Sequence, residues 1–293
     1  MSKRIFSGTM PALLTPLDKN GKVIVKTVKP LIDWEISKGA GGFYVCGSTG
    51  EGPVISGEQR RIMVEEAVSA VNGRVPVIAH VGAINVNEAC DLARHAEAVG
   101  ANAISSVAPN FYFNYEYSEV VEYYKRLAGS TSLPLILYAV TRMAGVDTNR
   151  MMVELLKVDN IIGVKDTRQN YYQMWQLRQL NGGDINIING PDETLLCGLM
   201  MGADGGIGST YNIMADKYAR LFKLFKDGKM EEARALQNQI TTIISVILKY
   251  GCLPSLKKYL ELSGFDMGQC AFPQTPLSDE DGRKMKQEVD ALM

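Results

Sequence analysis

A lysine near the end of an apolar segment is the residue with the most distinctive chemical potential in this sequence. Residues 160–167 are Asn-Ile-Ile-Gly-Val-Lys-Asp-Thr, and alternation along a strand would place Gly163 and Lys165 on one face. A lysine on the inner face of a crowded sheet would be desolvated, which favours the neutral amine that attacks a ketone to form a Schiff base. The segment alone equally allows a strand-end lysine whose ammonium reaches solvent.

A tyrosine ends the preceding apolar segment. Residues 133–138 are Leu-Pro-Leu-Ile-Leu-Tyr, and in a closed parallel sheet this strand would lie next to the lysine strand. The hydroxyl of Tyr138 would then be within reach of Lys165, where a phenol can relay protons to and from a substrate. A packed aromatic side chain with one satisfied hydroxyl would explain the same residue without catalysis.

The segment Cys46-Gly47-Ser48-Thr49-Gly50-Glu51 follows another short apolar run. Glycines on both sides of Ser48 and Thr49 allow a sharp turn that exposes backbone N–H groups and two hydroxyls, which suits a small anion such as a carboxylate. The segment lacks the lysine and the spacing of a nucleotide-binding P-loop. A tight turn with an N-capping hydroxyl explains the same residues without a ligand.

Two further segments carry polar or glycine-rich strand ends. Asp192 and Glu193 follow residues 189–191 and could accept hydrogen bonds from sugar hydroxyls. They could equally stabilise the N-terminus of a helix expected over 193–201. The glycines of residues 205–210 leave room for a ligand to approach the backbone.

These segments belong to a repeating pattern of short apolar runs and amphipathic stretches of period near 3.6. The candidate strands are Gly8–Leu14, Gly42–Cys46, Val75–His80, Ala103–Val107, Leu133–Tyr138, Ile161–Lys165, Ile185–Asn189 and Gly205–Ser209. Eight strands separated by helices in a chain of this length predict an α/β fold, a (β/α)8 TIM barrel. Lys-Gly-Ala, Val-Gly-Ala and Met-Gly-Ala at 38–40, 99–101 and 201–203 each put a glycine just past a helix. A doubly wound open sheet would show the same glycines, but no G-x-G-x-x-G follows the first strand.

After the eighth strand the pattern becomes purely helical. Helices are expected over 214–226, 229–250, 254–262 and 279–292. We therefore predict a barrel over residues 1–226 and a C-terminal helical extension, residues 227–293, packed on the barrel.

Composition limits the classes of function. The 293 residues carry a net charge of −1, which gives no electrostatic footprint for nucleic acid. Five widely spaced cysteines and two histidines make a disulfide framework or a metal site unexpected. No apolar run approaches the ~18 residues of a membrane helix, and no signal-peptide pattern opens the chain. We expect a cytoplasmic protein with no membrane partner, no metal and no cofactor beyond a covalent Schiff base.

Taken together, these motifs resemble the N-acetylneuraminate lyase and dihydrodipicolinate synthase superfamily of class I aldolases. The resemblance runs from Gly8 to the C-terminal helices, through Gly47–Glu51, Tyr138, Gly163-Val164-Lys165 and Gly202–Met214. The last segment is similar to the lyase branch in particular. The resemblance implies a homotetrameric enzyme that cleaves N-acetylneuraminate (sialic acid) reversibly to N-acetylmannosamine and pyruvate.

The resemblance also implies roles for individual residues. Lys165 would be the Schiff-base nucleophile and Tyr138 the proton shuttle, with Ser48 and Thr49 on the pyruvate carboxylate. The residues expected to contact the sugar-derived part are Thr167, Gly190, Asp192, Glu193 and Ser209. Tyr112 is expected near the mouth of the site.

Several positions depart from the family patterns. Where the lysine-biosynthesis branch carries a carboxylate-clamping arginine, this chain has Met143, which cannot make a bidentate contact. Arg142 beside it keeps dihydrodipicolinate synthase open as an alternative. Ala139, Thr141 and Arg168 differ from the usual lyase residues and could reshape the loop over the sugar chain.

Two more functions fit the same motifs. One is an aldolase for 2-keto-3-deoxy sugar acids, which would share the lysine chemistry and differ only in its substrate. The second is a non-catalytic keto-acid sensor, but a sensor would not need both the nucleophile and the proton shuttle.

Overall fold

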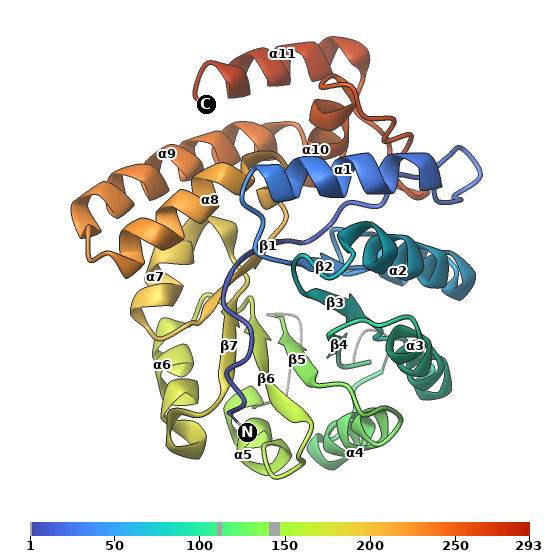
Figure 1. Cartoon of the computed structure of the whole chain (residues 1–293), viewed down its shortest axis with the longest axis vertical. Coiled ribbons are helices and arrows are strands. Elements are labelled where there is room, and N and C mark those ends of the chain that lie inside the picture. The colour runs from blue at the N-terminus through green and yellow to red at the C-terminus, as the bar shows by residue number, and fades with distance from the viewer. Residues whose placement is uncertain (1, 110–112, 141–146) are drawn as a thin grey trace.

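The computed structural model describes residues 2–109, 113–140 and 147–293, and its eight parallel strands form one sheet in the order β1-β8-β7-β6-β5-β4-β3-β2. A parallel bridge between Ala12 and Tyr44 joins the two ends of this order, so the sheet closes into the predicted (β/α)8 barrel (Figure 1). The strands are β1 Gly8–Pro11, β2 Phe43–Val45, β3 Val77–His80, β4 Ala103–Val107, β5 Leu135–Ala139, β6 Ile161–Asp166, β7 Asn186–Asn189 and β8 Gly205–Gly208.

Helices alternate with the strands and surround the barrel (Figure 1). They are α1 Val25–Ser37, α2 Gly57–Val71, α3 Val86–Ala98, α4 Tyr117–Ala128, α5 Thr148–Leu155, α6 Tyr171–Gln179, α7 Leu195–Met200 and α8 Tyr211–Lys226. The predicted helix over 193–201 is shorter than expected, because a 3-10 turn, η3 (Asp192–Thr194), precedes α7. Two other 3-10 segments are η1 (Gly52–Val54) and η2 (Leu180–Gly183).

The three glycines predicted to end helices adopt the left-handed conformation. Gly39, Gly100 and Gly202 have φ values of +96°, +88° and +99°. Only glycine takes up this geometry without a steric cost, so each helix stops where its strand must begin.

Apolar side chains pack in two separate layers. The barrel interior holds a small cluster that includes Met10, Tyr44, Ile78, Ile136 and Ile188. A much larger cluster fills the space between the sheet and the helices. Because strand side chains alternate, every second residue is available to fill the interior or to line the barrel mouth.

A β-bulge sets the orientation of the lysine strand. Leu135 pairs with Ile161, but Ile136 pairs with Gly163, so Ile162 is an extra residue in β6. Ile162 belongs to the interior cluster while Ile161 and Val164 belong to the outer one. The bulge therefore lets both Ile162 and Lys165 face the interior, which is a usual function of bulges next to sites.

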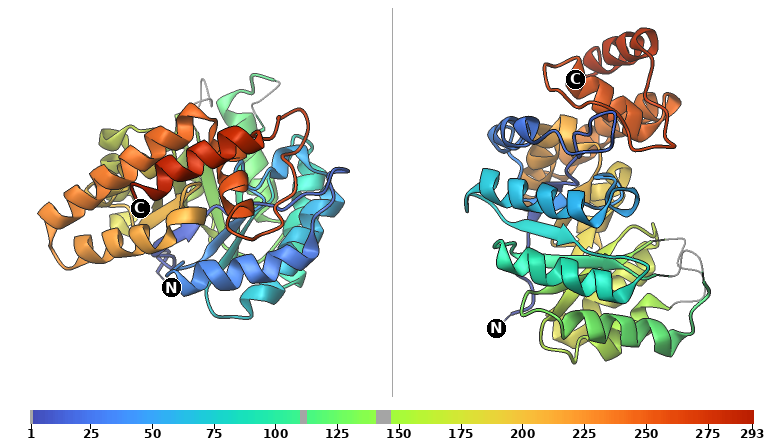
Figure 2. Two further views of the ribbon diagram at one scale, coloured as in Figure 1. Left: turned by 90° about the horizontal axis from the view of Figure 1, so that it is seen from above. Right: turned by 90° about the vertical axis from the view of Figure 1, so that its right-hand side faces the viewer.

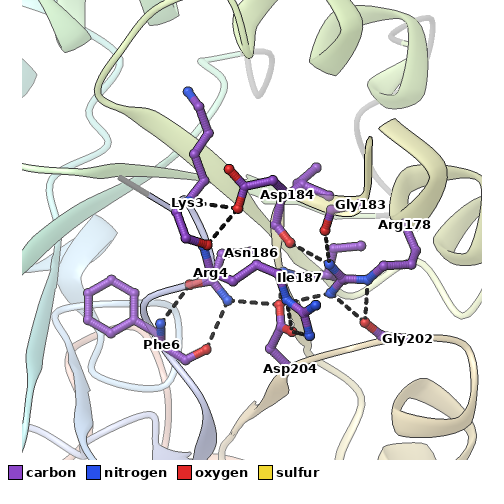
Figure 3. Close-up of polar contacts among 12 residues, drawn as sticks. Lys3, Arg4, Phe6, Arg178, Gly183, Asp184, Asn186, Ile187, Gly202 and Asp204 are labelled. Carbon is purple, nitrogen blue, oxygen red and sulfur yellow. Dashed lines mark hydrogen bonds and ion pairs between the residues drawn. The ribbon is translucent and has the colours of Figure 1, made fainter. Parts of the chain in front are cut away.

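A polar network closes the opposite end of the barrel, where the strands begin (Figure 3). Asp204 accepts hydrogen bonds from Arg4 (2.9 Å) and Arg178 (2.8 Å), and also from Asn186 and the backbone N–H of Ile187. The Lys3 ammonium lies 2.6–3.2 Å from four backbone carbonyl oxygens near the start of β6. These contacts tie the N-terminal segment across the base of the barrel, the face of such folds that serves stability.

Three helices follow the barrel: α9 (Met230–Lys249) and α10 (Cys252–Glu261) pack beside α8, and α11 (Asp279–Asp290) packs on α9 and α10 (Figures 1 and 2). Their bounds are close to the predicted spans. The proposed boundary between residues 226 and 227 falls where α8 ends. In the described part of the chain no single helix has the length and apolarity to cross a membrane. One pair of consecutive helices, α9 and α10, is long and apolar enough only when taken together, and the two are bent by 100° relative to each other.

One buried acid in α1 leads to a prediction about stability. Glu35 is fully buried, and among the described residues neither of its carboxylate oxygens has a hydrogen-bond partner. Burial raises the pKa of Glu35 well above its usual range. The folded chain therefore keeps a proton that the unfolded chain releases, so this residue makes the protein less stable as the pH rises above the carboxyl's ordinary pKa.

We expect Glu35→Met to raise the free energy of unfolding by about 1–3 kcal/mol near pH 7.5, because it removes an unpaired buried polar group. The gain should shrink toward pH 4.5. Denaturation at several pH values measures it, and Glu35→Gln, which removes only the ionisation, is the matched control. A gain that does not change with pH would contradict the assignment.

Candidate active site

Lys165 and Tyr138 meet at the carboxyl ends of adjacent strands. The register of β5 and β6 pairs the two residues directly, and their exposed fractions are 5% and 7%. The Lys165 Nζ lies 3.9 Å from the centre of the Tyr138 ring. The predicted proximity of the lysine and the tyrosine is confirmed.

A second tyrosine completes the surroundings of the lysine. The Lys165 Nζ lies 4.6 Å from the centre of the Tyr44 ring, and the Tyr44 hydroxyl is 3.0 Å from the Ser105 Oγ. The rings of Tyr44 and Tyr138 meet edge to face, with centroids 6.2 Å apart. The ammonium or amine of Lys165 is thus held against two aromatic rings, one of them fixed from β4.

His80 lies in the same cluster. Its ring is 6.2 Å from that of Tyr138, and its Nε2 accepts a 3.3 Å hydrogen bond from the backbone N–H of Val107. Burial, together with the nearby charges of Arg60 and Lys165, holds the pKa of His80 well below its usual range. A neutral His80 packs beside the ring of Tyr138.

The phenol of Tyr138 is electrostatically prepared to lose a proton. Burial alone would raise the pKa of Tyr138, but the charge of Lys165 and the close approach of the Thr167, Lys165 and Ser48 side chains outweigh it, so the pKa lies below its usual value. A lowered pKa favours the phenolate, which is the form of Tyr138 that can accept a proton from a substrate.

The loop after β2 brings hydroxyls to the same end of the barrel. A Cβ on Gly47 would lie 2.4 Å from the Tyr44 ring, so only glycine allows the loop to fold over that ring. Ser48 is exposed and Thr49 half-buried. The Thr49 Oγ1 lies 2.6 Å from the Ser209 Oγ at the end of β8, which joins two of the predicted contact residues.

Thr167 and Gly190 are in contact across β6 and β7. A Cβ on Gly190 would lie 2.1 Å from the Thr167 Oγ1, so the glycine makes room for the hydroxyl. The Thr167 Oγ1 is buried, and among the described residues no group forms a hydrogen bond of good geometry with it. It lies close to the phenol of Tyr138.

Asp192 is half-buried and bound to the start of α8. Its Oδ2 accepts hydrogen bonds from the backbone N–H (2.7 Å) and the hydroxyl (2.6 Å) of Thr210. Its Oδ1 lies over Gly208, where an added Cβ would come within 2.1 Å. Burial raises the pKa of Asp192 to about 6, although the Thr210 hydrogen bonds oppose this. Glu193 instead accepts a 2.5 Å hydrogen bond from Gln169.

Arg168 does not extend over the site. Its guanidinium forms a bidentate pair with the buried Asp166, at 2.8 and 2.7 Å, and also reaches Asn149 at the start of α5. Arg168, which stands where a small residue is usual, therefore links the loop after β6 to the end of β6 and to the start of α5.

Four of the residues named above lie outside the described residues: Tyr112, Thr141, Arg142 and Met143.

Tyr44 and Thr210 are site residues that the sequence analysis missed. Alternation along β2 could have indicated Tyr44, because its neighbours Phe43 and Val45 face outward and Tyr44 therefore faces the barrel interior. No pattern in the sequence indicated Thr210. In the parts of the chain that the structure describes, no three His, Cys, Asp or Glu residues gather as a metal-ligand set.

Comparisons with known proteins agree with this geometry. The N-acetylneuraminate lyase of Rhizobium meliloti is 35% identical over 98% of this chain and 95% of its own length. CdNal from Clostridium difficile, solved in complex with mannosamine, superposes with a TM-score of 0.93 at 32% identity, covering 98% of this chain and 99% of that one. A catalytic lysine mutant of the Ruminococcus gnavus sialic acid aldolase gives the same TM-score and identity over 98% and 95%. Residues 5–292 match the Dihydrodipicolinate synthetase family, and the chain belongs to that family.

Proposed function

We propose that this protein is an N-acetylneuraminate lyase that cleaves sialic acid reversibly to N-acetylmannosamine and pyruvate through a Schiff base on Lys165. The observation that carries the proposal is the buried Lys165, paired in register with Tyr138 and held against its ring. The names of the relatives support the same activity, and one solved relative is described as a catalytic lysine mutant.

The first steps form the covalent intermediate. The Lys165 amine attacks the C2 ketone of the open-chain sugar, and loss of water gives a protonated imine. The Ser48 and Thr49 hydroxyls and the N–H groups of their turn bind the adjacent carboxylate. The buried position of Lys165 limits the access of bulk water to the imine, while the single water needed for hydrolysis must still reach it.

The bond is then broken with the iminium as the electron sink. Tyr138 takes the proton of the C4 hydroxyl while the C3–C4 bond breaks, and the electron pair of that bond moves toward the iminium nitrogen. N-acetylmannosamine leaves as the aldehyde. The remaining enamine is protonated at C3 and hydrolysed, which releases pyruvate and restores the amine. No step requires a metal ion or an organic cofactor.

The sugar-derived part would lie over the ends of β6, β7 and β8. The residues that we propose to contact it are Thr167, Gly190, Asp192, Glu193 and Ser209, with Tyr112 near the mouth. Thr167 and Gly190 touch each other, and Ser209 touches Thr49. The proposal also includes a homotetramer in the cytoplasm, and light scattering tests the assembly.

The decisive experiment is pyruvate release from N-acetylneuraminate, coupled to lactate dehydrogenase and followed by loss of NADH absorbance. Robust turnover supports the proposal. No turnover, together with a borohydride-trapped pyruvate adduct at Lys165, would direct the search to 2-keto-3-deoxy acids and aspartate semialdehyde. Absence of any adduct would favour a keto-acid sensor.

The pKa of Asp192 gives a pH-dependent prediction. Above pH 6 the carboxylate is ionised and accepts hydrogen bonds from sugar hydroxyls, and it loses this capacity as the pH falls through about 6. We expect the KM for N-acetylneuraminate to rise about tenfold between pH 7.5 and pH 5.

The variant Asp192→Asn should show the high KM at both pH values, while borohydride trapping of pyruvate stays normal. Asp227→Asn, which alters an exposed carboxylate at the end of α8, is the matched control. A pH profile of KM that is identical in Asp192→Asn and the wild type would contradict this role.

A further inference from the structure

Glu51 ends the turn that carries Ser48 and Thr49, and the proposed mechanism gives it no task. It is 3% exposed and its backbone is left-handed, with φ +57°. A non-glycine residue holds this conformation only where its surroundings enforce it. The contacts of Glu51 show what enforces it here.

The backbone of Glu51 closes the turn. Its N–H donates to the carbonyl of Ser48 at 3.1 Å. Its carbonyl accepts from the N–H groups of Val54 (3.0 Å) and Ile55 (3.2 Å). A change in the backbone of Glu51 would therefore change the direction of the Ser48–Thr49 N–H groups and hydroxyls.

The side chain of Glu51 is held by the C-terminal part of the chain. Its carboxylate forms an ion pair with Lys257 of α10, which is also 3% exposed, and accepts a hydrogen bond from the backbone N–H of Ala271. Lys257 in turn donates to the carbonyl of Gln269 at 2.7 Å. The two buried charges are therefore paired with each other inside the protein.

The segment that holds Glu51 is itself fixed to the barrel. The N–H of Gln269 donates to the carbonyl of Leu17 at 2.8 Å, and the N–H of Leu17 donates to the carbonyl of Met267 at 3.2 Å. A Cβ on Gly268 would lie 1.9 Å from the same Leu17 carbonyl, so the two chain segments are in close contact. The segment that holds Glu51 is therefore joined by two backbone hydrogen bonds to the chain that follows β1.

We propose that Glu51 and Lys257 are positioning residues that hold the Ser48–Thr49 turn in the shape that binds the keto-acid carboxylate, so that the C-terminal helices take part in pyruvate binding. This role rests on the proposed function. It assigns a task to the one residue of the Gly47–Glu51 motif whose side chain points away from the substrate and into the protein.

The test measures the pyruvate concentration that half-saturates borohydride trapping at Lys165, by mass spectrometry, in the wild type and in Glu51→Gln. Glutamine keeps the size of the side chain but lacks its charge. We expect the half-saturating concentration to rise at least about tenfold, since one misdirected carboxylate contact has that effect. The fraction of protein trapped at saturating pyruvate should stay the same. A merely structural role would lower that fraction and leave the half-saturating concentration unchanged.

The neighbouring Lys258 provides the matched control. It lies on the same helix but pairs with Glu261 and Asp279, away from the turn. Lys258→Met should lower the melting temperature without changing the half-saturating concentration. Should Glu51→Gln fail to fold, the uncharged double variant Glu51→Gln/Lys257→Met takes its place with the same expectation.

The outcomes separate the two proposals. If the wild type forms no adduct, the proposed function fails, and this role fails with it. If the wild type is trapped but the folded Glu51 variant has a half-saturating concentration within twofold of it, only the positioning role is overturned.

Discussion

Replacing Lys165 with methionine is expected to lower the rate of pyruvate release from N-acetylneuraminate at least about 10⁴-fold, because it removes the only proposed nucleophile. Methionine keeps most of the apolar stem of lysine and lacks only the amine that lies over the rings of Tyr44 and Tyr138. The variant also removes an amine from a buried site, so no loss of stability is expected. The coupled assay measures the rate, and circular dichroism and melting temperature check the fold.

A matched control separates the chemistry from any general effect of losing a lysine. Lys157 is an exposed lysine shortly before β6, and Lys157→Met should keep full activity. Borohydride treatment with pyruvate should add mass to the wild type and to Lys157→Met but not to the Lys165 variant. Pyruvate release by folded Lys165→Met at a rate near that of the wild type would show that the Schiff base lies elsewhere or does not exist.

The prediction of the Lys165–Tyr138 pair from sequence succeeded because it needed only local rules. Alternation placed the lysine on the face of Gly163, and consecutive strands of a barrel are neighbours. The helix-ending glycines followed from the same kind of local reasoning. The bulge at Ile162 was not predictable, since it depends on the register with β5 and has no clear residue signature.

Contacts between distant segments account for the rest of what the sequence did not show. Two acids before a helix were expected either to bind sugar or to stabilise the helix, yet Asp192 binds Thr210, 18 residues further along. Arg168 was noted as a departure that could reshape the loop over the sugar chain, but the sequence did not indicate that its guanidinium reaches Asn149, 19 residues earlier in the chain. Such pairings are set by how neighbouring strands, loops and helices pack together, which no local pattern encodes.

The ion pair of Glu51 with Lys257 is the extreme case of this kind. Strands β3 to β8 lie between the two residues in the sequence, and nothing in the segment of either residue indicates the other as its partner. Only the packing of α10 and the segment after it against the β2 loop brings them together. A site built on strand ends is therefore predictable in its reactive residues and less so in the residues that support them.

Replacing Tyr138 with phenylalanine is expected to lower kcat for N-acetylneuraminate cleavage by about 10²–10⁴-fold, the usual contribution of a general base. The ring that packs against Lys165 stays, and only the hydroxyl with the lowered pKa is lost. Because Schiff-base formation needs Lys165 rather than this base in the cleavage step, borohydride should still trap pyruvate on the variant. The two assays together separate the nucleophile from the proton shuttle.

The control for this experiment is Tyr124→Phe, which deletes a buried hydroxyl that donates to the Ser106 carbonyl at 3.1 Å. This variant loses a buried hydrogen bond, as Tyr138→Phe does. Tyr124 lies in the layer between the sheet and the helices, so kcat should stay within about twofold of the wild type. Equal losses in the two variants would mean that the Tyr138 hydroxyl supports the fold and not the chemistry. A large loss confined to Tyr138→Phe, with trapping intact, is the pattern that a proton shuttle requires, because only a group in contact with the reacting atoms affects bond cleavage without affecting imine formation.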